Sequence, residues 1–169
     1  FWFICPECKG DYCASLGSIT TGYRCPCSKN KTETKMRQHL IEKYSKDYEV
    51  VYQAKFDWCK NESGIRHLPF DFSLVNKTDS RLKYIIEVDG PQHFIQILNW
   101  KSAELTQIQD KKKDALALEN KYKVIRLKQE EIWMNKFDWK AALDEAIKNE
   151  FKIEVEYVVK NKDKDYYSN

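Results

Sequence analysis

Three acidic residues in two neighbouring segments are the residues of this sequence best suited to chemistry. Glu87 and Asp89 stand two positions apart, and Asp71 lies upstream between two phenylalanines. An acid in such apolar surroundings is costly unless it is paired or bound to a metal. Acids held together out of water also repel one another, and a hard cation with oxygen ligands relieves that repulsion. The pattern predicts a Mg²⁺ (or Mn²⁺) site held by Asp71, Glu87 and Asp89.

The segments that carry these acids have the character of β-strands. The apolar run 84–86 precedes the acid pair, and a Gly-Pro dipeptide follows it. Side chains two positions apart on a strand share a face, so Glu87 and Asp89 should leave the sheet together. The polar loop 76–80 separates this strand from the segment 67–75, and we expect a hairpin that brings all three carboxylates to one place. The alternative is a surface hairpin with charged turn residues.

The sequence around these acids resembles the PD-(D/E)xK nuclease superfamily. Phe70-Asp71, followed by Ile-Glu-Val-Asp-Gly-Pro-Gln-His at 86–93, is similar to its very short patch repair-like branch, which includes the EDxHD homing endonucleases. The resemblance spans residues 31–128, and Asp89 stands where the general superfamily has Lys. It implies an α/β, restriction-endonuclease-like core in which helices flank a mixed sheet. It also implies Mg²⁺-dependent hydrolysis of DNA phosphodiester bonds, in a homing, restriction or repair setting.

The resemblance implies catalytic roles for residues next to the acids. His93 is a candidate general base or acid, because the unperturbed pKa of imidazole lies near neutrality. Gln92 would orient the attacking water or a phosphate oxygen. Asp71 and Glu87 would hold the metal, with the Asp89 carboxylate or a neighbouring backbone carbonyl as a further ligand.

Two expected helices carry the remaining catalytic candidates. A helix over 32–44 has Glu33 in its first turn, where the nuclease branch places an active-site acid. The alternative is that Glu33 serves only the helix dipole. A helix over 102–120 places Asp110 and Lys113 on one face, and the branch has a DxxK-like pair there. The alternative for that pair is a solvated, charged helix face.

DNA is the partner that the resemblance implies. Arg66 is a candidate phosphate contact, and Lys111 and Lys112 are candidates for contacts with the DNA backbone. The formal net charge of +3 fits nucleic-acid binding without requiring it. One active site cuts one strand per visit, so cleavage of both strands would call for a homodimer, a larger assembly or two visits.

The cysteines are concentrated at the start of the chain. Five of the six lie in the first thirty residues, and Cys5-Pro-Glu-Cys8 and Cys25-Pro-Cys27 form two closely spaced pairs. Four thiolates in two such pairs predict a structural Zn²⁺ held by Cys5, Cys8, Cys25 and Cys27, with Cys13 in reserve. This part resembles the zinc ribbons or treble clefs that often precede such nuclease domains. The alternative is a disulfide-linked, secreted domain.

The sequence of 169 residues suits one core domain and a small appendage. We expect a zinc-binding module at 1–30, a nuclease domain at 31–159 and a disordered tail at 160–169. The chain contains no apolar run of about 18 residues, so no transmembrane helix is expected, and we predict an intracellular location. The remaining elements expected in the core are strands over 48–56, 122–127 and 153–159 and a helix over 137–151.

A function of a different class stays open. The same fold could serve as a non-catalytic DNA-binding or assembly module in which the carboxylates are idle. Intact Asp71, Glu87, Asp89 and His93 favour catalysis, because an idle site has no reason to keep costly buried acids together.

Overall fold

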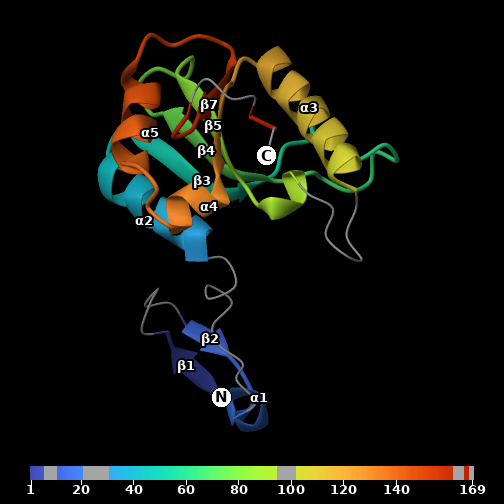
Figure 1. Cartoon of the computed structure of the whole chain (residues 1–169), viewed down its shortest axis with the longest axis vertical. Helices are drawn as coiled ribbons and strands as arrows, with labels where there is room; N and C mark the ends of the chain where they lie inside the picture. The colour runs from blue at the N-terminus through green and yellow to red at the C-terminus, as the bar shows by residue number, and fades with distance from the viewer. Residues whose placement is uncertain (6–10, 21–30, 95–101, 162–165, 168–169) are drawn as a thin grey trace.

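A computed structural model describes residues 1–5, 11–20, 31–94, 102–161 and 166–167 (Figure 1). Its centre is a five-stranded mixed sheet in the order β3-β4-β5-β6-β7. The first three strands are antiparallel, and β5, β6 and β7 run parallel. The fold is therefore α/β, as the sequence predicts. The strands are β3 (Tyr48–Ala54), β4 (Phe70–Asn76), β5 (Lys83–Asp89), β6 (Lys123–Lys128) and β7 (Val155–Val158).

Helices connect and cover these strands. The parallel step from β5 to β6 passes through a long helix, as parallel strands require a crossover. That helix begins where the Ser102 side chain accepts a hydrogen bond from the Leu105 N–H, and it ends at Asn120. The helices of the core are α2 (Lys31–Tyr44), the 3₁₀ helix η2 (Pro91–His93), α3 (Ala103–Glu119), α4 (Gln129–Trp133) and α5 (Trp139–Lys148).

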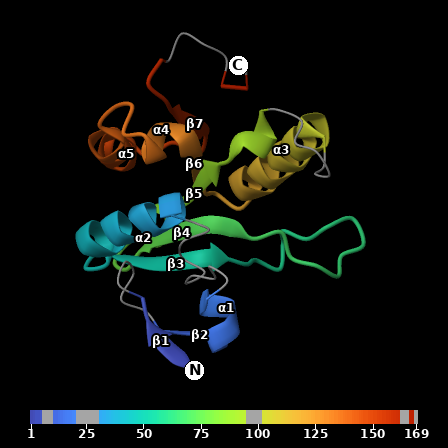
Figure 2. The same cartoon turned by 60° about the horizontal axis from the view of Figure 1, so that its bottom comes forward.

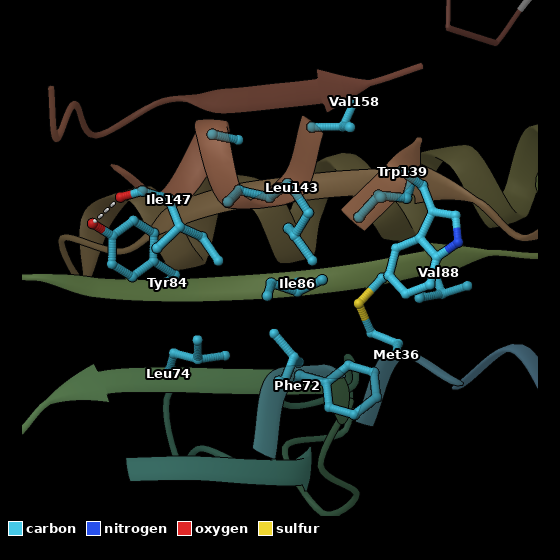
Figure 3. Close-up of a cluster of buried hydrophobic side chains, with 14 of the residues drawn as sticks. Met36, Phe72, Leu74, Tyr84, Ile86, Val88, Trp139, Leu143, Ile147 and Val158 are labelled. Atoms are coloured by element: carbon cyan, nitrogen blue, oxygen red, sulfur yellow. Dashed lines mark hydrogen bonds between the residues drawn. The ribbon is translucent and has the colours of Figure 1, made fainter. Parts of the chain in front are cut away.

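The larger hydrophobic core lies on the face of the sheet that α2, α4 and α5 cover. Met36 of α2 and Trp139 and Leu143 of α5 pack there against side chains of the central strands (Figure 3). The Tyr84 hydroxyl lies in this core and donates a hydrogen bond to the Ile147 carbonyl oxygen at 3.1 Å. Burial of this apolar surface is the main force that holds the three helices on the sheet.

A second core lies on the opposite face, beneath α3. Phe70, Ile85 and Val124 contribute to it from three adjacent strands, and Ala117 contributes from α3. Figure 2 shows α3 apart from α2, α4 and α5, with the strands between them. The sheet is therefore covered on both faces, and its central strands are buried.

This two-sided arrangement decides where the acids of β5 point. Ile86 and Val88 belong to the larger core, so Glu87 and Asp89, which alternate with them, face α3. Both acids are buried. Arg126 of β6 pairs in register with Glu87 and shares the α3 face. The predicted common face of Glu87 and Asp89 is confirmed.

The N-terminal part forms a small sheet of its own. Strands β1 (Trp2–Ile4) and β2 (Asp11–Cys13) pair antiparallel, and a short helix, α1 (Leu16–Thr20), follows. Cys5 is buried and Cys13 is exposed. The other proposed zinc ligands, Cys8, Cys25 and Cys27, lie outside the described residues, so the zinc site stays a prediction.

The expected disordered tail contains a residue that packs into the core domain. Tyr166 is only 5% exposed, and its ring contacts the rings of Phe94 and Tyr157. The disorder expected for 160–169 stays a prediction, because residues 162–165 and 168–169 lie outside the described residues. In the described part of the chain, no helix combines the length and the apolar character needed to cross a membrane.

Candidate functional site

Asp71 and Glu87 interlock across β4 and β5. The Asp71 N–H donates to the Glu87 carboxylate at 3.0 Å, and the Val88 N–H donates to the Asp71 carboxylate at 2.8 Å. The last paired residues of this ladder are Phe72 and Ile86. Beyond them the strands separate, and the two carboxylates accept the hydrogen bonds of the backbone N–H groups that strand pairing no longer satisfies. The expected hairpin thus brings Asp71 and Glu87 together.

Lys113 of α3 joins this pair. Its ammonium group forms an ion pair with the Glu87 carboxylate and donates to the Pro69 carbonyl oxygen at 2.8 Å. Burial alone would lower the pKa of Lys113, but the charge and hydrogen bond of Glu87 outweigh it and raise the pKa above its ordinary value. Lys113 is therefore a buried, charged partner of Glu87 and not part of a solvated helix face.

Asp71 lies in surroundings that disfavour its charged form. Burial raises the pKa of Asp71 well above its ordinary value, and the negative charges of Glu87 and Glu33 raise it further. The N–H of Val88 and the charge of Lys113 work in the opposite direction without cancelling the effect. A cation beside Asp71 would therefore be stabilised.

Glu33 reaches the same site from α2 through a residue that the sequence analysis missed. The Gln53 side-chain amide nitrogen lies 3.4 Å from the Glu33 carboxylate and 3.3 Å from the Asp71 carboxylate, and donates to both. The Tyr52 hydroxyl also donates to Glu33, at 2.7 Å. Glu33 thus lies beside the acids, although this does not exclude its favourable place in the first turn of the helix.

Asp89 belongs to a second group, built around Arg126. The Arg126 guanidinium donates to both oxygens of Asp89, at 2.8 and 2.6 Å, and to Asp114 at 2.8 Å. It also lies 3.2 Å from an Asp110 oxygen. Burial opposes the charge of Arg126, but the Asp89 and Asp114 carboxylates outweigh it and hold its pKa above the ordinary value. Arg126 is fully buried.

His93 lies beside this second group. Its Nδ1 is 2.6 Å from an Asp110 oxygen and 3.6 Å from an Asp89 oxygen. Burial favours the neutral imidazole, but the hydrogen bond to Asp110 and the charge of Asp89 raise the pKa of His93 above its ordinary value. Ligand atoms of Asp89, His93 and Asp110 all lie within 4.8 Å of one another.

Tyr166 closes the Arg126 group from the side of the C-terminal segment. Its hydroxyl donates to the Asp89 oxygen that also accepts from the Arg126 Nε, at 2.8 Å. The Lys128 ammonium lies over the rings of Tyr166 and Phe94. The carboxylate of Asp89 is therefore surrounded by donors.

Arg126 and Gln53 are among the site residues that the sequence analysis missed, together with Tyr52, Asp114 and Tyr166. A signal existed for Arg126, because a charged residue inside the apolar segment 122–127 requires a buried partner. No comparable signal marks Gln53. The side chain of Gln92, in η2, lies outside what the structure describes.

The candidate DNA contacts are exposed, as such contacts need to be. Lys111 and Lys112 lie on the exposed side of α3, and Arg66 lies in the loop before β4. Lys112 also borders a cavity of about 340 Å³ between α3 and the loop, lined by Asn61, Glu62, Leu68, Leu105, Ile108 and Gln109. None of these three cations contacts the acids in any interaction found among the described residues.

The acids of these two groups outnumber the cations that pair with them. Two permanent cations, Lys113 and Arg126, face a larger set of acids: Glu33, Asp71, Glu87, Asp89, Asp110 and Asp114. Such an excess favours the binding of a cation. Comparison of the chain with protein-family models, with curated proteins and with solved structures found no match.

Proposed function

We propose that this protein is a metal-dependent DNA endonuclease that hydrolyses phosphodiester bonds. The observation that carries the proposal is the interlocked Asp71–Glu87 pair, buried under α3 with the Lys113 ammonium against it. The order of a helix, three antiparallel strands, a helix and a parallel strand supports a restriction-endonuclease-like core. An intracellular location and a structural zinc in the N-terminal part belong to the same proposal.

The residues on the Asp71 side fit a Mg²⁺ or Mn²⁺ ion. Among the described residues, one Asp71 oxygen accepts only the long contact from Gln53, and Glu33 lies on the other side of that amide. Asp71, Glu87 and Glu33 would therefore hold the ion through oxygen atoms, the ligands that hard divalent cations prefer. When bound, such an ion polarises the scissile phosphate and lowers the pKa of its water.

Asp89 has a different role in this proposal from the one expected from sequence. Both of its oxygens already accept from Arg126, so an ion placed among Asp89, His93 and Asp110 would lie against a guanidinium. In this proposal Asp89 holds Arg126 in place, and the metal ion binds on the Asp71 side.

His93 and Lys113 supply the remaining chemistry. The bond from Nδ1 to Asp110 leaves the His93 Nε2 as the atom that accepts a proton from the attacking water. Lys113, charged and held against Glu87, lies where it would stabilise negative charge that develops on the phosphate. Lys111, Lys112 and Arg66 would hold the DNA backbone outside the acids.

The test is cleavage of supercoiled plasmid DNA with Mg²⁺ or Mn²⁺. Asp71→Asn and Glu87→Gln should each abolish cutting, because each removes a metal-binding charge while keeping the size of the side chain. Asp79→Asn, in the exposed turn between β4 and β5, is the matched control and should cut like the wild type. A wild type that binds DNA but leaves it intact with either metal would contradict catalysis and favour the DNA-binding or assembly module.

A further inference from the structure

Gln53 has a backbone conformation that is unusual for its place in the fold. Its φ is +51°, in the left-handed region, although it lies inside β3 between Tyr52 and Ala54, which both pair with β4. Two other described residues besides glycine have positive φ, Lys121 and Asn135, and each follows the C-terminal cap of a helix. A left-handed residue is common after a helix but is strained within a strand.

This conformation lets two neighbouring side chains meet at one carboxylate. Successive side chains of a regular strand point to opposite faces of the sheet. The Tyr52 hydroxyl and the Gln53 amide nevertheless both donate to the same Glu33 oxygen, at 2.7 and 3.4 Å. The Gln53 amide also donates to Asp71, which faces it across β3 and β4, at 3.3 Å.

We propose that Gln53 is a positioning residue that ties Glu33 of α2 to the Asp71–Glu87 pair so that these acids share one divalent cation. This inference rests on the proposed function. An amide suits the task because it donates two N–H groups and carries no charge. It therefore holds Glu33 and Asp71 without neutralising them, whereas Lys113 neutralises Glu87.

The inference is tested by titrating the protein with MnCl₂ in a calorimeter. Gln53→Gly keeps the backbone, since glycine adopts positive φ readily, and removes the amide. Gln53→Met keeps a side chain of similar length without N–H donors. Both variants should bind Mn²⁺ about 10–100-fold more weakly than the wild type, the usual loss when a residue that orients a metal ligand is removed. Plasmid cleavage at limiting Mn²⁺ should fall in both variants as well.

Lys121→Gly is the matched control, because it places glycine at another positive φ, after α3. It should leave Mn²⁺ affinity unchanged, and thermal unfolding should show all variants folded. Gln53→Gly and Gln53→Met binding Mn²⁺ within about twofold of the wild type would overturn the inference. A wild type that binds Mn²⁺ through Asp71 but cuts no DNA would refute the proposed function alone. A wild type without Mn²⁺ affinity would refute both.

Discussion

Arg126 and Asp89 form a two-pronged ion pair that is sealed from solvent. The guanidinium Nε and one terminal nitrogen donate to the two Asp89 oxygens at 2.8 and 2.6 Å, and neither residue is more than 2% exposed. The geometry is the parallel fork that makes arginine–carboxylate pairs strong and directional. It fixes β5 to β6 on the side where the candidate site lies.

Removal of the arginine should destabilise the protein severely. Arg126→Met leaves the buried carboxylates of Asp89 and Asp114 without a counter-charge, which costs about 3–5 kcal/mol of the free energy of unfolding. Urea denaturation measures this loss. Arg81→Met, which breaks an exposed ion pair with Asp79, is the control and should change stability little. Equal unfolding midpoints for the two variants would contradict the structural role of Arg126.

The pH dependence of cleavage should report on His93. A base must be neutral, so kcat/KM should rise with pH through the pKa of His93, which lies above its ordinary value of 6.5. Asp110→Asn removes a negative partner and should move this acid limb to lower pH. His93→Gln should lower the rate about 10²–10⁴-fold. An acid limb that does not move in Asp110→Asn would show that another group controls it.

Stability without added metal should depend on pH through Asp114. Burial raises the pKa of Asp114 to about 6, so the folded state binds this proton more tightly than the unfolded state. Its contribution is therefore full below pH 4 and is lost as the pH rises to about 6. Asp114→Asn should flatten the pH dependence of the unfolding free energy in this window, on the order of 3 kcal/mol. Chemical denaturation at several pH values measures the slope.

Asp79 provides the contrasting control for that measurement. Hydrogen bonds from Arg81 lower the pKa of Asp79 to about 2, so its contribution has the opposite sign and is lost only at pH values below 4. Asp79→Asn should leave the window between pH 4 and 6 unchanged. If Asp114→Asn and Asp79→Asn behave alike there, the assignment of the slope to Asp114 fails.

The N-terminal part should contain about one equivalent of zinc. Cys8→Ser and Cys25→Ser should each reduce the zinc content measured by elemental analysis, because each removes a predicted thiolate ligand. Cys59→Ser is the matched control, since Cys59 is buried among apolar residues of the second core. Disulfides in place of zinc would support the alternative of a secreted, cross-linked domain.

Alternation along one strand was enough to predict the face of the site. Ile86 and Val88 are apolar and face the larger core, so the alternating residues Glu87 and Asp89 were expected to share the opposite face of the sheet. In the structure they do. Alternation does not say which cation each acid meets. Lys113 and Arg126 come from distant elements, and their positions follow from the packing of α3 and the register of β6.

Other features of the site were not predictable from local sequence patterns. A left-handed residue is anticipated most easily at glycine or asparagine, and Gln53 is neither. Tyr166 is buried although it stands among charged residues, so the composition of that segment did not predict its burial. These features depend on tertiary contacts that local patterns do not encode.

The spacing of these contacts along the chain sets the order in which the site can be completed during synthesis. The Asp71–Glu87 interlock joins residues 16 apart, the Arg126–Asp89 fork spans 37, and the Tyr166–Asp89 bond spans 77. Domains emerge from the ribosome N-terminal end first, and distant contacts form last. The acids of the site therefore emerge from the ribosome before Arg126, and Asp89 is fully enclosed only after residue 166 has emerged.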